Sequence, residues 1–148
     1  MQSAEKIFFS LEGKWGLTRS TNGFGKMKGD ALFSLIPDTM PSFSYREEGI
    51  YETPYGEDLL FYREYIYVLY DGKIEIYFAS HQKKQHLFHT LTFAPSRKEC
   101  AVSVHLCGKD LYTPTYVFLD EDTFTLEYKV KGPKKDLVIQ TYFQRRAN

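Results

Sequence analysis

The clearest regularity in this chain is an alternation of apolar and polar side chains with a period of two. Over residues 73–78, the apolar side chains Ile74, Ile76 and Phe78 fall on one face and the residues between them on the other. Residues 124–131 alternate in the same way. A period of two is typical of antiparallel strands that place one face on a core and the other in water. The pattern therefore predicts an all-β protein.

Turn-forming residues divide these strands at regular intervals. Asp71-Gly72 is the strongest signal, because a type I′ hairpin turn needs two residues that accept positive φ. The pattern predicts about ten strands, over residues 13–21, 27–36, 43–53, 58–70, 73–80, 86–94, 99–107, 112–119, 123–131 and 136–145. One short helix is expected over residues 4–11, with Ser3 as its N-cap. Consecutive strands leave two unpaired edges unless the sheet closes, so we predict a single closed up-and-down β-barrel spanning residues 1–148.

The composition fits a folded domain and excludes several partners. The 148 residues are 43% hydrophobic and 17% aromatic, which rules out a disordered chain. Nineteen Lys+Arg balance nineteen Asp+Glu, so neither nucleic acid nor an acidic membrane is an expected partner. No apolar run reaches the ~18 residues of a membrane span, and the start of the chain lacks the features of a signal peptide. A protein partner is neither predicted nor excluded.

The two cysteines, Cys100 and Cys107, are expected to be free thiols. Their odd spacing places the side chains on opposite faces of one strand, roughly 23 Å apart at ~3.3 Å per residue. A disulfide cannot span that distance. Free thiols and the absence of an export signal indicate a reducing, cytoplasmic setting.

The two ends of the predicted barrel sequence carry a pair of residues that suggests a superfamily. Gly13-Lys14-Trp15 opens the first strand, and Arg145 closes the last one. This arrangement resembles the calycin superfamily, which includes the lipocalins and fatty-acid-binding proteins. The resemblance implies that Trp15 plugs the closed end of the barrel and that Arg145 packs across it, where a guanidinium can stack on an indole.

A closer resemblance covers nearly the whole chain. The matching segments are Trp15 with Arg19, Tyr62–Tyr65, Leu87–His89, His105–Tyr112 and Gly132–Asp136. They resemble an uncharacterised domain-of-unknown-function family of small barrels, which occur alone or fused to flavin- and nicotinamide-binding oxidoreductase domains. The resemblance implies a fold and a candidate pocket, but no activity. Residues 80–85 replace the short turn expected there, so we expect a different loop at that rim.

Two histidines are predicted to meet inside the barrel. If residues 95 and 99 pair at the base of a turn, His89 faces His105 with Cβ atoms ~5 Å apart. Leu87 and Leu91 mark this face as the inner one. The pair is either a polar spot that binds a ligand or two structural histidines that neighbouring tyrosine hydroxyls satisfy. Zinc bound with Asp110 or Cys107, or haem on one histidine, are further alternatives, but we expect no metal and no cofactor.

Arg63 is the second candidate, in a strand whose two faces are both aromatic. If Arg63 points inward, it is a cation that needs a carboxylate, which Glu47 or an anionic ligand supplies. If it points outward into a surface ion pair, Glu64 points inward instead. Tyrosines add hydroxyl donors for a polar or aromatic ligand, and the candidates are Tyr45, Tyr51, Tyr112 and Tyr116.

Three functions are compatible with these residues. The first is a module that binds a polar or aromatic, anionic small molecule. The second is a cofactor-independent enzyme of the lyase, isomerase or decarboxylase type, which the calycin resemblance implies, with His89 or His105 as acid or base and Arg63 holding a carboxylate. The third is a protein-interaction domain with an outer aromatic face, for which Tyr67, Tyr70 and Tyr77 are the candidates. We rank them in this order. The neutral overall charge combined with Arg63, His89 and His105 near one cavity supports the first function. The sequence has no nucleotide-binding, P-loop or hydrolase motif.

Overall fold

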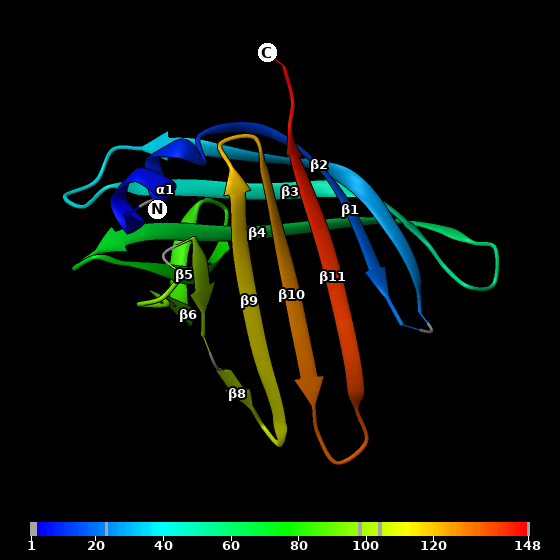
Figure 1. Cartoon of the computed structure of the whole chain (residues 1–148). Helices are drawn as coiled ribbons and strands as arrows, with labels where there is room; N and C mark the ends of the chain where they lie inside the picture. The colour runs from blue at the N-terminus through cyan, green and yellow to red at the C-terminus, as the bar shows by residue number, and fades with distance from the viewer. Residues whose placement is uncertain (1–2, 23, 98, 104, 148) are drawn as a thin grey trace.

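The computed structural model describes residues 3–22, 24–97, 99–103 and 105–147, and for residues 105–107 it describes the backbone alone. The described residues form one helix and eleven strands (Figure 1). Their bounds are α1 Ala4–Ser10, β1 Gly13–Thr21, β2 Gly25–Ile36, β3 Ser42–Glu52, β4 Asp58–Tyr70, β5 Lys73–Ser80, β6 Lys83–Phe93, β7 Cys100–Val102, β8 His105–Cys107, β9 Asp110–Asp120, β10 Thr123–Lys131 and β11 Asp136–Arg145.

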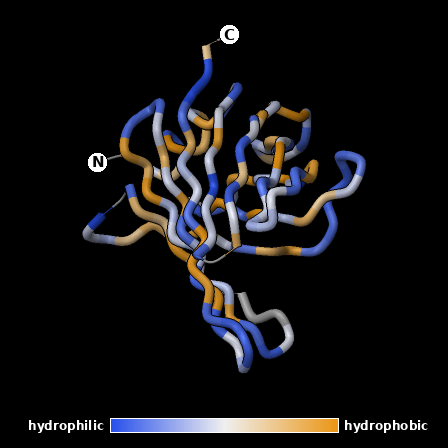
Figure 2. The backbone as a smooth tube through the Cα atoms, turned by 90° about the vertical axis from the view of Figure 1, so that its right-hand side faces the viewer, coloured by the Kyte–Doolittle hydropathy of each residue, from blue (hydrophilic) through white to orange (hydrophobic). Residues whose placement is uncertain are grey.

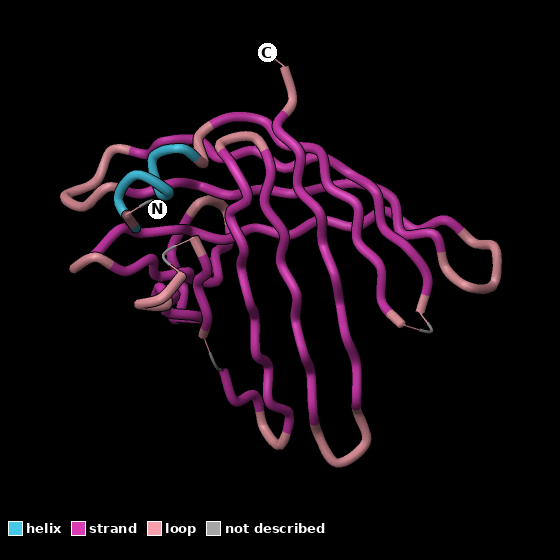
Figure 3. The backbone as a smooth tube through the Cα atoms, in the orientation of Figure 1, coloured by secondary structure: helices cyan, strands magenta, loops and turns pink. Residues whose placement is uncertain are grey.

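The strands form one antiparallel sheet that closes on itself, which confirms the predicted barrel (Figure 3). The ring runs β10-β11-β1-β2-β3-β4-β5-β6-β7-β9, and β9 pairs back to β10. β7 pairs with residues 115–117 of β9, and β8 pairs with residues 110–112 of the same strand. Neighbouring strands follow one another along the chain almost throughout, as in an up-and-down barrel.

Five of the ten predicted strands begin and end where the alternation predicts. β1, β4, β5, β10 and β11 have the predicted bounds. The predicted strand 99–107 is divided into β7 and β8, and β6 begins at Lys83 rather than at 86. The reason for the second difference is a tight turn at His81 and Gln82, whose φ angles of 53° and 62° are those of a type I′ hairpin.

Hydrophobic and hydrophilic stretches alternate along the strands (Figure 2), and the inward side chains form one continuous core. Helix α1 closes one end of the barrel with Ile7 and Phe8, both buried. Ser3 caps the helix as predicted, because its side chain accepts a hydrogen bond from the Lys6 N–H at 3.2 Å. Large side chains from strands on all sides pack beneath the helix, among them Trp15, Phe33, Phe43, Ile74, Leu91, Phe124 and Phe143.

Trp15 and Arg145 meet at this closed end, as the resemblance implies. The Arg145 guanidinium carbon lies 4.4 Å from the centre of the indole ring, and the indole N–H donates to the Leu11 carbonyl at 2.9 Å. Arg145 also donates to the carbonyls of Ser10 and Glu12 at the end of α1. The indole plug and its arginine therefore join the helix to the barrel.

The described cysteine behaves as predicted. Cys100 is buried and forms no disulfide, while the side chain of Cys107 lies outside the described residues. A membrane-crossing helix, which needs a long apolar run, does not occur in the described part of the chain.

Candidate functional site

A cavity of about 250 Å³ lies inside the barrel next to the packed core. Strand alternation builds it, because β1 turns Trp15, Leu17 and Arg19 to the same face, and β3 does the same with Tyr45 and Glu47. Six tyrosines contribute to the wall. The lining residues are Arg19, Tyr45, Glu47, Arg63, Tyr65, Tyr67, Phe88, Tyr112, Tyr116, Leu126, Tyr128, Ile139 and Phe143.

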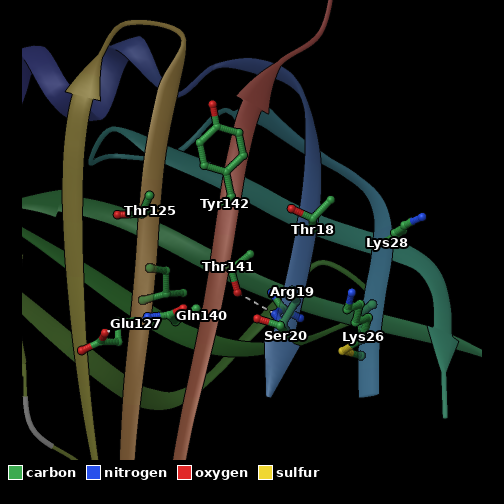
Figure 4. A pocket seen from close by; sticks show the side chains of 12 residues that line it. Thr18, Arg19, Ser20, Lys26, Lys28, Thr125, Glu127, Gln140, Thr141 and Tyr142 are labelled. Carbon is green, nitrogen blue, oxygen red and sulfur yellow. Dashed lines mark hydrogen bonds between the residues drawn. The ribbon is translucent and has the colours of Figure 1, made fainter. Parts of the chain in front are cut away.

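A buried ion pair between Arg19 and Glu47 forms one wall of the cavity. The Arg19 guanidinium donates through both terminal nitrogens to the two carboxylate oxygens of Glu47, at 2.8 and 3.1 Å. Its Nε donates to the Thr141 hydroxyl at 2.7 Å (Figure 4), and the Tyr45 hydroxyl donates to Glu47 at 2.6 Å. Glu47 is only 2% exposed. Such a bidentate pair with further donors satisfies both buried charges.

Burial and the Glu47 carboxylate together set the protonation states in this wall. Burial acts to lower the pKa of Arg19, but the hydrogen bond and the charge of Glu47 outweigh it and hold that pKa above its ordinary value. Burial, and then the neighbouring Glu47 charge, raise the pKa of Tyr45 well above 10. The phenol therefore stays protonated and keeps donating to the carboxylate at physiological pH.

Tyr67 and Tyr116 form the floor of the cavity. Their hydroxyl oxygens are 3.3 Å apart, so one hydroxyl donates to the other. Both side chains also touch the core layer beneath, next to Phe33 and Leu91. Burial raises the pKa of both phenols well above 10, so both are neutral.

Arg63 lies on the inner face at the rim, which resolves the two alternatives for its strand. It faces Glu47 in the β3–β4 register and lines the cavity, but its side chain is exposed. Within the described residues it forms no ion pair, because Glu47 is paired with Arg19 instead. Glu64 points outward, where it accepts hydrogen bonds from the Tyr62 hydroxyl and the Gln82 N–H.

His89 is buried and faces inward, with an exposed fraction of 1%. Its Nε2 lies 2.9 Å from the Tyr128 hydroxyl, and its ring stacks on Phe88 at 3.8 Å between centroids. A β-bulge explains how two consecutive residues turn inward: Ile76 faces His89 but Tyr77 faces Leu87, so β6 has one extra residue between them.

The predicted contact between His89 and His105 is not among the described pairings. The predicted register does hold at the base of the turn, where Thr92 faces Val102 and Phe93 faces Ala101. Described pairing between β6 and β7 ends there, and β8 pairs His105 with Tyr112 on β9 instead. The His105 side chain lies outside the described residues, so its place in the site stays a prediction.

Three further predictions need correction. Leu87 was expected to face inward but is 42% exposed, because the bulge turns it outward. Tyr51 does not line the cavity, and its hydroxyl donates to the Phe24 carbonyl. Tyr67 was assigned to an outer aromatic face but is buried in the cavity floor. That face therefore keeps only Tyr70 and the half-buried Tyr77.

Metal ligands are sparse in the described part of the site. No group of three or more His, Cys, Asp or Glu side chains among the described residues is placed to hold a metal ion. His105 and Cys107, which the zinc alternative requires, have no described side chains. The cavity chemistry established by the structure is therefore that of phenols, two guanidinium groups and one carboxylate.

A second groove that Arg19 helps to line lies on the outer face of the sheet (Figure 4). It has a volume of about 630 Å³ and runs over β1, β2, β10 and β11. Exposed side chains such as Ser20, Lys26 and Gln140 line it. Because no buried charge points into this groove and the Arg19 guanidinium is bound to Glu47, the internal cavity is the better candidate site.

Sequence reasoning missed Arg19 as a site residue, although a signal was present. Arg19 shares its parity with Trp15 and Leu17, and the tryptophan was already placed inside the barrel. Glu47 shares its parity with Tyr45 in the same way. Strand parity could therefore have placed both charges on the inner face, although it does not show that they pair.

Comparisons with known proteins agree with this closed barrel. The chain belongs to a family of unknown function, DUF6314, whose model matches residues 11–145. This confirms the resemblance to an uncharacterised barrel family. No curated protein matches the chain.

Two solved structures share the fold at low sequence identity. The S-type phycobiliprotein lyase CPES from Guillardia theta is 13% identical, with a TM-score of 0.72 over 99% of this chain and 94% of that chain. A barrel described as EF1p2_mFAP2b bound to DFHBI is also 13% identical, with a TM-score of 0.52 over 97% of this chain and 100% of that chain. At such identities the similarity establishes the fold alone.

Proposed function

We propose that this protein binds a small anionic aromatic molecule in the internal cavity. The observation that carries the proposal is the net charge of the cavity lining. The charged residues described there are Arg19, Arg63 and Glu47, which gives a net charge of one positive unit. The Arg19–Glu47 pair is internally neutralised, so the free charge belongs to Arg63 at the rim. Tyrosine rings on the wall supply faces and edges for an aromatic ring.

The cavity volume limits the ligand to a small molecule. Pockets for drug-sized ligands measure roughly 300–1,000 Å³, whereas this cavity measures about 250 Å³. A barrel of similar fold that is bound to DFHBI supports the idea that this fold can hold a small molecule. Tyr45, Glu47, Tyr112 and Tyr116 are the predicted binding residues that line the same cavity as Arg63, and we propose that they contact the ligand.

A pair of probes that differ in charge tests this proposal. We expect 2-naphthoate to bind more tightly than uncharged 2-naphthamide, and Arg63→Gln to weaken 2-naphthoate by about tenfold, the scale of one charge-assisted hydrogen bond. Affinity is measured by titration calorimetry at low salt, since salt screens an exposed charge.

The matched control is Arg46→Gln. Arg46 lies on the neighbouring strand, but on the outer face, opposite Glu64. This variant should bind both probes as the unaltered protein does. Equal affinity for the two probes in the unaltered protein, or equal losses in the two variants, would contradict the proposal.

A second candidate function is acid–base catalysis on the bound molecule, and the contact between His89 and Tyr128 favours it. Tyr128 lines the cavity, and the buried imidazole is hydrogen-bonded to its hydroxyl. A buried histidine behind a phenol can relay a proton to a ligand. Mass spectrometry of aromatic carboxylates incubated with the protein tests this function. His89→Gln should abolish product formation while 2-naphthoate still binds. Unchanged product formation in that variant would reject the relay.

A further inference from the structure

The tyrosine hydroxyls in the cavity wall differ in their hydrogen-bond partners. The Tyr45 hydroxyl donates to Glu47, and the Tyr128 hydroxyl is hydrogen-bonded to His89. Tyr67 and Tyr116 bond only to each other among the described residues. Two phenols carry two O–H protons, and their mutual hydrogen bond uses one of them. One donor proton is therefore left over at the cavity floor.

This surplus donor is buried and stays protonated at physiological pH. Tyr67 is 6% exposed and Tyr116 is 4% exposed. Burial raises the pKa of both hydroxyls well above 10, so neither loses its proton at physiological pH. A ligand with an oxygen acceptor at this position therefore forms a hydrogen bond that an apolar group of the same shape cannot form.

Resting on the proposed function, we infer that the ligand is an aromatic anion with an oxygen acceptor at the end opposite its charge. The acceptor takes the surplus proton of the Tyr67–Tyr116 pair, and the anion meets Arg63. Tyr67, Tyr65 and Arg63 are successive inward positions on β4. Floor and rim are thus about 13 Å apart between α carbons, at ~3.3 Å per residue. Aromatic carboxylates with a para carbonyl group have this arrangement.

Two nearly isosteric probes isolate the acceptor: 4-acetylbenzoate and 4-isopropylbenzoate. The isopropyl group is the more hydrophobic, so burial alone favours 4-isopropylbenzoate. A preference for 4-acetylbenzoate therefore requires a donor in the cavity. We expect the unaltered protein to bind 4-acetylbenzoate about fivefold to tenfold more tightly, which is the scale of one neutral hydrogen bond.

Tyrosine variants locate the donor. The phenol that remains in each single variant keeps its own proton, so we expect at least one of Tyr67→Phe and Tyr116→Phe to retain the preference. The double variant should lose it, while the control Tyr70→Phe, at an exposed position, should keep it. Near-UV circular dichroism confirms that each variant is folded. If the double variant still prefers 4-acetylbenzoate, or if the unaltered protein binds both probes equally, the inference is overturned.

The outcome separates this inference from the proposed function. Equal binding of the two probes that still depends on Arg63 rejects the acceptor and leaves the anionic aromatic ligand in place. Binding of neither probe, or binding that Arg63→Gln does not weaken, rejects both.

Discussion

At the scale of single residues, Arg145 joins three parts of the chain. Its guanidinium stacks on Trp15 and donates to the carbonyls at the end of α1. It also forms an ion pair with Asp122 in the turn between β9 and β10, at 3.0 Å. Arg145 therefore connects the helix, the first strand and the β9–β10 turn. Because its guanidinium stacks on the Trp15 indole, we expect the closed end of the barrel to depend on that indole.

Trp15→Ala should lower the free energy of unfolding by ~3–5 kcal/mol, the cost of truncating a buried aromatic side chain. The indole is 1% exposed and packs against Phe124. Urea denaturation monitored by circular dichroism measures this loss. Trp15→Phe, which keeps an aromatic ring in place, should lose clearly less. A loss below ~1 kcal/mol for the alanine variant would contradict the role of the indole as a plug.

The buried ion pair gives a second prediction at this scale. Glu47→Leu should destabilise the protein by about 3–5 kcal/mol, because the Arg19 charge then has no buried partner. Adding Arg19→Met should recover most of that loss, since an apolar pair of similar volume needs no compensation. Denaturant titration of the two variants tests this. A double variant as unstable as Glu47→Leu alone would show that packing, and not the unpaired charge, causes the loss.

Single residues were predictable where the resemblance names them, but not where a contact depends on the three-dimensional curvature of the barrel. Trp15 and Arg145 were predictable because the resemblance names both. The pairing of Arg19 with Glu47 connects β1 to β3, and β2 separates these strands in the sheet. Strand parity indicates that both charges face inward, but only the curvature of the barrel brings them within 2.8 Å.

At the scale of elements, alternation and turn chemistry predicted the strands well. Asp71-Gly72 forms the predicted turn, with φ angles of 53° and 70°. The start of β6 and the inward orientation of Leu87 were predicted wrongly. The bulge between Leu87 and His89 interrupts the alternation in this strand. A bulge inserts one residue without any compositional mark, so the sequence could not show that Leu87 turns outward and Phe88 inward.

Two glycines illustrate an element-scale constraint that the sequence does carry. Gly29 and Gly49 face each other across β2 and β3. A Cβ at Gly49 would lie 2.0 Å from the Lys28 carbonyl oxygen, and one at Gly29 would lie 2.2 Å from the Glu48 carbonyl oxygen. The two backbones therefore approach so closely that neither position accepts a side chain without backbone movement.

At the scale of the whole molecule, the buried phenols make stability depend on alkaline pH. Burial raises the pKa values of Tyr45, Tyr67, Tyr116 and Tyr128 in the folded state. The unfolded chain releases these protons near pH ~10, and the folded chain retains them. The stability that these phenols contribute is therefore fully present below about pH 10, and it is lost as the pH rises toward their folded-state pKa values.

Denaturant titrations at about pH 8 and about pH 11 should thus give a lower unfolding free energy at the higher pH. Absorbance at 295 nm reports phenolate formation. The part of the absorbance change that belongs to Tyr45, Tyr67, Tyr116 and Tyr128 should appear only together with the loss of near-UV circular dichroism. Ionisation of all tyrosines in a protein that keeps its near-UV spectrum would contradict this prediction.

The length of the pairing between neighbouring strands varies around the barrel, and this affects how copies of the chain could associate. β2 and β3 pair from Lys26 to Ile36, whereas the described pairing of β6 with β7 covers Thr92 and Phe93. We expect thermal opening to begin where the described pairing is shortest, and amide hydrogen exchange should be faster there than along β2 and β3.

Such an opening would uncover strand edges on which a second copy could add its own strand. Lys83 and Lys84 stand at the start of β6, and lysine on an edge opposes that kind of addition. Replacing both with threonine should leave the folded barrel unchanged but make it aggregate faster at high concentration under mild denaturation, as light scattering would show. The two lysines would then protect the chain during the brief periods in which its barrel is open.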